Sequence, residues 1–594
     1  MYKFIICIFL LFFHTLLFSN QTIIEKALSL KLDTNDYWLQ LLHFEDGKSI
    51  ITNKDFFIST HGHTDPKKEL IKTLQNIYNT PIVRCKYPAR VKWLEKKLDS
   101  LLPKSTQCKE LDRYFIKNHK KLHIVFTSQR YDVADSLFGH TFLKVETDDI
   151  EYAINYVATV PENRNHFLHI YKGLLGKYPS NYTITPLSQQ DYEYRAKEFR
   201  DLVQFELKYS KDEIENIMLH LYEIQNIQQD YYFITRNCSS EILKLLNMAN
   251  YENKIQNKSS QPTLPVDIIY SLEDTNRITN ISKQYSKLKL FYQYEERLNN
   301  YAKKILKKII RHKQSINALD QNEELSLESK KDIILASILY IEMLSYTREF
   351  ETKYTYSLLK LINLANKYDL KRDFELSENI PINPLSNKFH KISLATQHNT
   401  KASEAYTFEY HYLSKNRFDL MHSSDQNGTV ELFDINIKKQ NNTLKLNKLI
   451  LFNIEAMPLS NSFFTNNTKK TTLGAKRLFY DDDLYNFFDY GIGYKRSLYR
   501  NIHYHFMGNV GIYYFDKTLI KASFESSLEY LYQNIFITEL KLEISSFTNE
   551  KYTQNIILNN HLKVNESTVL NLSVQHNKDS KEYTNFLFRY TFLF

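Results

Sequence analysis

The sequence Ser136-Leu-Phe-Gly-His-Thr-Phe-Leu-Lys-Val145 joins a histidine to a pattern that is typical of a β-strand. Gly139 stands directly before His140, and a glycine lets the backbone come close to whatever faces it. The β-branched and aromatic residues that follow favour extended chain. This stretch therefore predicts a strand that carries a histidine at its first position.

A second stretch, Thr235-Arg-Asn-Cys-Ser-Ser-Glu-Ile-Leu-Lys-Leu-Leu246, places Cys238 at the start of a helix. Asn237 is a suitable N-cap, and an apolar series follows the cysteine at helical spacing. The helix N-terminus favours negative charge, so a thiol there loses its proton readily. A histidine beside it completes the activation of a nucleophile. We therefore expect Cys238 to be a nucleophile and His140 its base, although a lone buried cysteine is more often a small apolar core residue.

The composition indicates a large, folded chain with several domains. The 594 residues include only 11 glycines but 44 tyrosines and 38 phenylalanines, which argues against disorder and for aromatic-rich packed or lipid-facing surfaces. The net charge of +9 is spread along the chain. The basic run 303–313 could contact phosphates, but we favour the interpretation that these residues form the solvent-exposed face of an amphipathic helix. We expect no nucleic acid partner.

Residues 1–20 have the pattern of a secretory signal peptide. One positive residue precedes an apolar run, and small or polar residues follow near Ser19 and Asn20. An uncleaved anchor is the alternative, but the run is short for spanning a membrane. No cysteine stands at the expected cleavage point, since Cys7 lies inside the apolar run, so we do not expect a lipoprotein.

Removal of the signal peptide leaves three cysteines, an odd number for an exported protein. Cys85 and Cys108 are close enough in sequence to form a disulfide in an oxidising compartment. This pairing would leave Cys238 as the free thiol.

The segment 56–70 contains His61, His63 and Asp65 within five residues, followed by Pro66. The three side chains could hold a metal ion. A helix start with proline in the first turn and Glu69 nearby is the ordinary interpretation, and it is favoured. We predict no metal site and no cofactor.

Strands are expected from residue 122 onward. Residues 122–126 form one, 139–145 the next and 152–157 the third, since neighbours in sequence usually pair. On this basis Asn155 is the candidate that orients His140; the alternative is a strand asparagine that faces solvent. Residues 167–179 are expected to form a loop with glycine hinges that faces lipid or substrate, or else packs on the domain. Ser210 and Glu213 form a capping box that begins a long helix.

The remainder of the chain changes periodicity twice. Residues 285–312 and 325–368 predict two long antiparallel helices that link domains. Beyond residue 385 apolar residues alternate with polar ones, as in Phe586, Phe588, Tyr590, Phe592 and Phe594. Roughly twelve such segments separated by polar turns are typical of a transmembrane β-barrel. A soluble β-sandwich or half-barrel remains the alternative.

Several motifs together resemble the Lnb-type N-terminal periplasmic domain family. They are Ser136-x-Phe-Gly-His140-Thr-Phe-Leu, Ile154-Asn-Tyr-Val-Ala, Lys172-Gly-Leu-Leu-Gly-Lys-Tyr-Pro, Asp230-Tyr-Tyr-Phe and Asn237-Cys238-Ser. The resemblance runs from about residue 30 to about 270, because the segment with Cys85-x-Tyr-Pro-Ala-Arg90 is similar to the helical part that accompanies this domain. The family resembles circularly permuted papain-like thiol enzymes, including NlpC-like ones.

The resemblance implies a lipoprotein N-acyltransferase. Cys238 would take an acyl chain from a phospholipid donor and pass it to the amino group of a lipoprotein N-terminus, with His140 as the base; Asn155 is our own inference for the third role. Such enzymes carry transmembrane helices after the periplasmic domain, whereas this chain predicts a barrel. We therefore expect it at the outer membrane. The alternatives are a cell-wall peptidase or amidase with the same dyad, and a non-enzymatic barrel with a periplasmic adaptor.

The expected fold class is thus α+β, a permuted papain-like domain with helical segments, followed by an antiparallel β-barrel. The expected domains are a signal peptide at 1–20, a helical segment at 21–120, a catalytic domain at 121–270, a helical linker at 271–384 and a barrel at 385–594.

Overall fold

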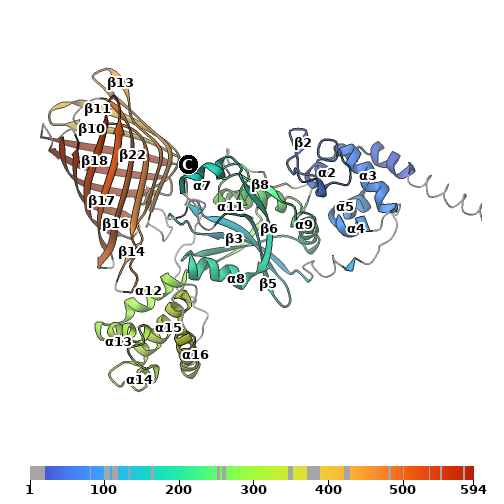
Figure 1. The fold of residues 1–594 in the computed structure, drawn as a ribbon, viewed down its shortest axis with the longest axis horizontal. Helices are drawn as coiled ribbons and strands as arrows, with labels where there is room; N and C mark the ends of the chain where they lie inside the picture. The colour runs from blue at the N-terminus through green and yellow to red at the C-terminus, as the bar shows by residue number, and fades with distance from the viewer. Residues whose placement is uncertain are drawn as a thin grey trace, which may run out of the picture. The chain divides into compact units, whose positions relative to one another are not determined.

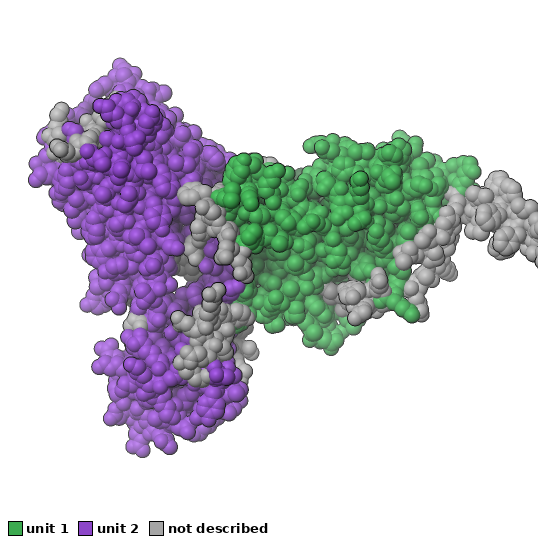
Figure 2. Space-filling model, in the orientation of Figure 1, with its two compact units in different colours: residues 1–127, 140–195, 202–283 green, residues 128–139, 196–201, 284–594 purple. Residues whose placement is uncertain are grey.

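The computed structural model forms two compact units, coloured green and purple in Figure 2. One comprises residues 1–127, 140–195 and 202–283, and the other residues 128–139, 196–201 and 284–594. The predicted signal peptide lies outside the described residues. The structure describes residues 21–79, 82–98, 108–109, 111, 118–131, 133, 136–161, 166–250, 254–256, 263–344, 352–370, 388–419, 428–461, 463–478, 483–499, 501–533, 535–548, 551–578 and 582–594.

The first unit begins with short helices that share one apolar core. The helical segment is divided, because Lys31 takes a left-handed backbone conformation and Asn35 starts a new helix as its N-cap. Trp38 stacks on Trp93 at a ring separation of 5.7 Å. Beyond a first helix at 21–29, the elements are η1 (Leu32–Thr34), α2 (Asp36–Leu41), β1 (Phe44–Glu45), β2 (Lys48–Ser49), η2 (Lys54–Phe56), α3 (Pro66–Asn79), α4 (Ile82–Lys86) and α5 (Pro88–Leu98).

A disulfide joins Cys85 of α4 to Cys108, as the cysteine count indicated. A buried ion pair also stabilises this region, since Arg90 of α5 lies 2.9 Å from a carboxylate oxygen of Glu69 and 3.3 Å from one of Glu223. All three side chains are fully buried, so the guanidinium needs both partners to offset its lost hydration.

A seven-stranded sheet follows, with the order β8-β6-β5-β4-β3-β7-β9 (Figure 1). The three strands expected between 122 and 157 are present and adjacent. Consecutive residues of the central strands β3 and β4 are buried. Because successive side chains point to opposite faces, both faces of the sheet are covered. The strands are β3 (Lys121–Thr127), β4 (His140–Glu146), β5 (Glu151–Ala158), β6 (Tyr178–Pro186), β7 (Leu202–Leu207), β8 (Gln229–Tyr231) and β9 (Ile278–Gln284).

The helices of this domain include one that we expected to be a loop. Residues 167–179 do not form a glycine-hinged loop; α7 covers most of the segment and β6 follows directly. The capping box of Ser210 and Glu213 is confirmed at the start of α9. The helices are α7 (His166–Leu174), α8 (Leu187–Asp191), a π-helical turn (Tyr192–Lys197), α9 (Lys211–Ile224), α10 (Cys238–Leu246) and α11 (Pro265–Asp274).

The described residues of the second unit do not form the two long linking helices that we expected; they form five shorter helices that share an apolar core. The first break comes at Leu298, which is extended, and Asn299 then caps a new helix. The basic run lies on α13, where Ile305, Leu306 and Ile309 are buried, so the amphipathic interpretation is correct. The helices are α12 (Lys287–Arg297), α13 (Asn300–Ile310), α14 (Ile316–Asp320), α15 (Leu327–Leu344) and α16 (Thr352–Lys367).

Twelve antiparallel strands close into a barrel, because β10 pairs with β22 as well as with β11 (Figure 1). The sandwich alternative is therefore wrong. The barrel strands are β10 (Lys391–Asn399), β11 (Ala402–Lys415), β12 (Gly428–Gln440), β13 (Thr443–Ala456), β15 (Thr468–Arg477), β16 (Leu484–Tyr499), β17 (Ile502–Tyr514), β18 (Thr518–Tyr532), β19 (Phe536–Phe547), β20 (Tyr552–Asn565), β21 (Thr568–Lys578) and β22 (Tyr583–Leu593), and β14 (Leu459–Ser460) adds to β16.

The two faces of the barrel wall differ in chemistry. The alternating aromatic residues of β22, from Phe586 to Phe592, are 42 to 47% exposed on the outside. Charged residues such as Lys495, Glu529 and Glu539 are buried inside. An apolar outer face and a polar interior are the pattern of a barrel that lies in a lipid bilayer. None of the described helices is both long and apolar enough to cross a membrane.

Candidate functional site

Cys238 is the first residue of α10, and its position depends on Asn237. The side-chain oxygen of Asn237 accepts hydrogen bonds from the backbone N–H groups of Ser239 and Ser240. Its amide nitrogen donates to the carbonyl oxygens of Phe233 and Thr263. Asn237 therefore fixes both the helix start and the segment before it, and the cap does not use the N–H of Cys238. Cys238 is the only free cysteine among the described residues.

The electrostatic surroundings favour the thiolate form of Cys238. Burial by itself raises the pKa of the thiol, but the charge of His140 and a hydrogen bond with it act in the opposite direction. The backbone N–H of Thr141 and the hydroxyl of Ser239 also donate to the sulfur. Together they lower the pKa of Cys238 from 9.0 to about 6. A thiol with this pKa is mostly in the thiolate form at neutral pH, and the thiolate is the nucleophilic form.

His140 and Asn155 meet across two adjacent strands. Lys144 of β4 pairs with Ala153 of β5, so strand alternation places His140 and Asn155 on the same face of the sheet. His140 Nε2 lies 3.2 Å from Asn155 Oδ1. Because an amide oxygen only accepts, Nε2 donates the proton, which leaves Nδ1 as the nitrogen that can take a proton from the thiol. The structure thus brings together all three residues that the sequence singled out.

Two contacts at this site carried no recognisable signal in the sequence. The ring of Tyr194, in the π-helical turn, lies 5.9 Å from the ring of His140. The backbone N–H of Thr141 reaches the sulfur only because α10 packs against the start of β4. Single-turn π segments often occur at functional sites, but a sequence does not mark them.

Gly139, directly before His140, has a backbone conformation that other residues rarely adopt. Its φ is +90°, in the left-handed region that favours glycine. A residue with a side chain would be strained there, so the glycine allows the turn from which β4 starts.

The three candidate metal ligands near residue 61 do not form a cluster within the described residues. Asp65 instead caps α3, with its Oδ1 accepting from the backbone N–H of Lys68 at 2.9 Å. The helix-start interpretation is the one the geometry supports.

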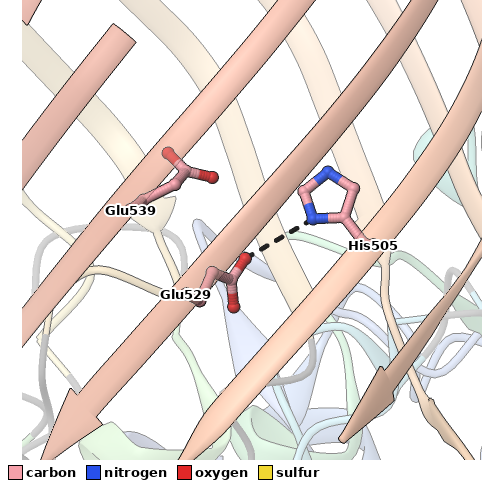
Figure 3. Close-up of side chains that lie close together, drawn as sticks. All are labelled: His505, Glu529 and Glu539. Carbon is pink, nitrogen blue, oxygen red and sulfur yellow. Dashed lines mark ion pairs between the residues drawn. The ribbon is translucent and has the colours of Figure 1, made fainter. Parts of the chain in front are cut away.

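A different group of possible metal ligands, His505, Glu529 and Glu539, lies inside the barrel (Figure 3). Each of the two carboxylates already has a cationic partner. Arg417 bonds to both, reaching Glu539 at 2.9 Å, and Lys495 lies 2.7 Å from Glu529. The cluster therefore belongs to a network of ion pairs across the lumen, in which a divalent ion would have to compete with two fixed cations.

The apolar outer wall, the closed strand ring and the polar interior define a membrane β-barrel protein whose N-terminal part is an α+β domain with a buried thiol beside a histidine. Residues 116–275 of that part match the Lnb N-terminal periplasmic domain. Residues 30–97 and 383–592 match two domains of unknown function, DUF7843 and DUF7840.

Three of the solved structures similar to this chain are two porins and an outer membrane channel. The KdgM porin is 10% identical, with 34% of this chain and 99% of that chain covered and a TM-score of 0.23. The NanC porin is 6% identical, with 34% and 100% covered and a TM-score of 0.25. The COG4313 outer membrane channel from Pseudomonas putida F1 is 10% identical, with 38% and 99% covered and a TM-score of 0.26. No curated protein matches the chain.

The location of the protein follows from two of its own features. The strands between residues 391 and 593 form a closed barrel with an apolar outer wall, and residues 116–275 match a domain described as periplasmic. Strand barrels of this type occur in outer membranes. The protein is therefore an outer-membrane protein with a periplasmic domain.

Proposed function

We propose that the periplasmic domain is a thiol acyltransferase, which moves an acyl chain from a phospholipid to an amine through a thioester on Cys238. The acceptor that we propose is the N-terminus of a lipoprotein. The observation that carries the proposal is the Cys238, His140 and Asn155 arrangement in a domain that matches the Lnb N-terminal periplasmic domain. The histidine strand precedes the cysteine helix, the reverse of the order in papain, which supports a permuted papain-like relationship.

The first half-reaction forms the thioester. The Cys238 thiolate attacks the ester carbonyl carbon of the phospholipid, and negative charge develops on the carbonyl oxygen. The N–H of Cys238, at the helix N-terminus, is placed to donate to this oxygen. The carbon–oxygen bond to the glycerol then breaks, and the imidazolium of His140 gives its proton to the leaving alcohol, so a lysophospholipid departs.

The second half-reaction transfers the acyl group. A neutral amine attacks the thioester carbonyl, and His140 removes a proton from the attacking nitrogen. The carbon–sulfur bond breaks, which restores the thiolate and yields an amide. Asn155 holds the imidazole so that one nitrogen faces the thiol in both steps. No step needs a metal or an organic cofactor.

Intact-protein mass spectrometry tests this proposal. Full-length protein purified from membranes and incubated with phospholipid should gain an acyl mass that hydroxylamine removes. Cys238→Ala should lack the added mass. Addition of a synthetic diacylated lipopeptide with a free amino group should discharge the thioester and give a triacylated product. An unmodified wild-type protein would contradict acyl transfer, and release of peptide fragments from cell-wall material would instead favour a peptidase that uses the same residues.

A further inference from the structure

Helix α7 and the turn after it carry four large apolar side chains that are about half exposed. Leu168, Tyr171, Leu174 and Leu175 are 50, 60, 46 and 46% exposed. Leu168, Tyr171 and Leu175 are spaced by three and four residues, so they lie on one side of the helix and its C-terminal turn. Among the described residues of the first unit, the other exposed large apolar side chains, Leu30, Ile150 and Ile281, stand singly in the sequence.

The opposite side of α7 is packed against the segment that leads to the nucleophile. The ring of buried His169 lies 5.2 Å from that of Phe233, and its Nδ1 lies 3.0 Å from the hydroxyl of Tyr178. Gly173 faces the Phe233 ring so closely that a Cβ would lie 2.4 Å from it, and its carbonyl oxygen accepts from the Phe233 N–H. The glycine thus gives close packing and is not a hinge.

This packing connects α7 to Cys238 in a few steps. Asn237 donates to the carbonyl oxygen of Phe233 and also caps α10, whose first residue is Cys238. Gly176, with φ at +67°, allows a similar contact with Tyr232. The apolar face is therefore held rigidly next to the backbone that positions the thiol, and on the outside of the domain.

The charge of the segment is of one sign. Residues 166–178 contain Lys172 and Lys177, both exposed, and no aspartate or glutamate. An apolar face flanked by lysines fits the boundary between acyl chains and phosphate groups, where apolar side chains enter the lipid and cations contact phosphates. A protein partner with an apolar groove would not require this absence of acidic residues.

We propose that α7 docks in the headgroup region of a phospholipid bilayer, with Leu168, Tyr171 and Leu175 inserted and Lys172 and Lys177 at the phosphates. This inference deepens the proposed function, on which it rests, because it names the surface that would bring ester-bearing lipid to Cys238. The occupant is a lipid bilayer, which the barrel of the same chain already requires, and not a second protein.

The direct test measures depth in the membrane. Full-length protein with Tyr171→Cys, carrying a nitroxide label, is reconstituted in vesicles of phosphatidylethanolamine and phosphatidylglycerol. Ile150→Cys is the matched control, an exposed apolar residue (48%) beyond the end of β4. Wild-type protein treated with the same label gives the signal that comes from any labelling of buried Cys238, and this signal is subtracted. The label at 171 should collide more with oxygen than with a water-soluble nickel chelate, and the label at 150 should show the reverse.

A label at 171 that behaves like the one at 150 would overturn the proposal. So would a label shielded from both relaxing agents, because this would mean that protein covers the face. Neither reading depends on acyl transfer, so this experiment decides the docking of α7 even if no thioester ever forms.

A second measurement links the surface to the reaction. The double variant Leu168→Ser, Leu175→Ser should form the thioester at least tenfold more slowly from vesicle phospholipid, yet at the wild-type rate from a monomeric short-chain phospholipid. Equal slowing with both donors would show a general loss of the site and would contradict docking. An unchanged rate with vesicles would contradict it as well.

Discussion

His140 Nε2 lies 3.2 Å from Asn155 Oδ1, and the two residues come from neighbouring strands of one sheet. A rigid sheet thus fixes the imidazole, while the thiol comes from a helix that packs on the same strands. Preorganisation of this kind keeps the same imidazole nitrogen directed at the thiol.

Loss of the oriented imidazole should slow thioester formation. We expect His140→Ala to reduce the rate by about 10²- to 10⁴-fold, the usual contribution of general acid–base catalysis. Asn155→Ala should have a smaller effect, because the histidine remains but is free to rotate. Initial rates of acyl-mass gain measure both. Asn181→Ala, a part-buried asparagine on β6, is the control and should react like wild type; equal rates for Asn155→Ala and wild type would remove Asn155 from the site.

The ionisation of Cys238 should be visible without any substrate. The thiolate absorbs near 240 nm, so the difference spectrum between wild type and Cys238→Ser should rise with pH through a midpoint of about 6. The thiol is only 4% exposed, which makes absorbance a better probe than alkylation. In His140→Ala the midpoint should move above the ordinary thiol pKa, because burial raises it and the opposing charge is gone. A midpoint that does not move would show that the histidine does not stabilise the thiolate.

Gly173→Val should disturb the site from a distance. The added side chain would push the Phe233 ring away, and the carbonyl oxygen of Phe233 would shift from Asn237. Overpacking of this size costs about 1–3 kcal/mol. We expect slower thioester formation together with a shifted thiolate midpoint. Gly508→Ala is the control, because nothing lies within 4 Å of its Cβ position.

The disulfide should stabilise the helices that precede the sheet. Cys85 and Cys108 are separated by 23 residues, and closure of a loop of this size is worth about 3 kcal/mol in the chain-entropy model. Trp38 and Trp93, the two tryptophans of the chain, both lie in this region and report on it alone. Their fluorescence should change at lower urea concentration in Cys85→Ser, Cys108→Ser than in wild type. Coincident curves would mean that the helices do not depend on the crosslink.

Arg417 should restrict the lumen of the barrel. Its guanidinium extends from the end of β11 to Glu529 of β18 and Glu539 of β19. Arg417→Ala removes this bridge, so we expect a larger single-channel conductance in planar bilayers than wild type gives. Arg496→Ala, on an exposed side chain of β16, should leave the conductance unchanged. If Arg417→Ala also matches wild type, the bridge does not limit ion flow.

Local patterns were sufficient for much of the fold. Alternation of apolar and polar residues predicted about twelve barrel strands, because each strand must present one face to lipid and the other to a polar interior. The start of α9 followed from a capping box, and α3 from Pro66 after Asp65. The helix break at Leu298 was missed, since no glycine or proline marks it.

The sequence by itself singled out the candidate site residues: a cysteine after a capping asparagine, a histidine after a glycine, and an asparagine on the next strand. Only the tertiary structure decided that they meet, because strand pairing and helix packing join parts of the chain that are distant in sequence. The segment before β6 that we expected to be a loop is mostly the helix α7, and Gly173 in this helix allows the ring of Phe233 to pack closely. Closure of the barrel was likewise a tertiary event, since the pairing of β10 with β22 joins the two ends of the strand region and local periodicity does not encode it.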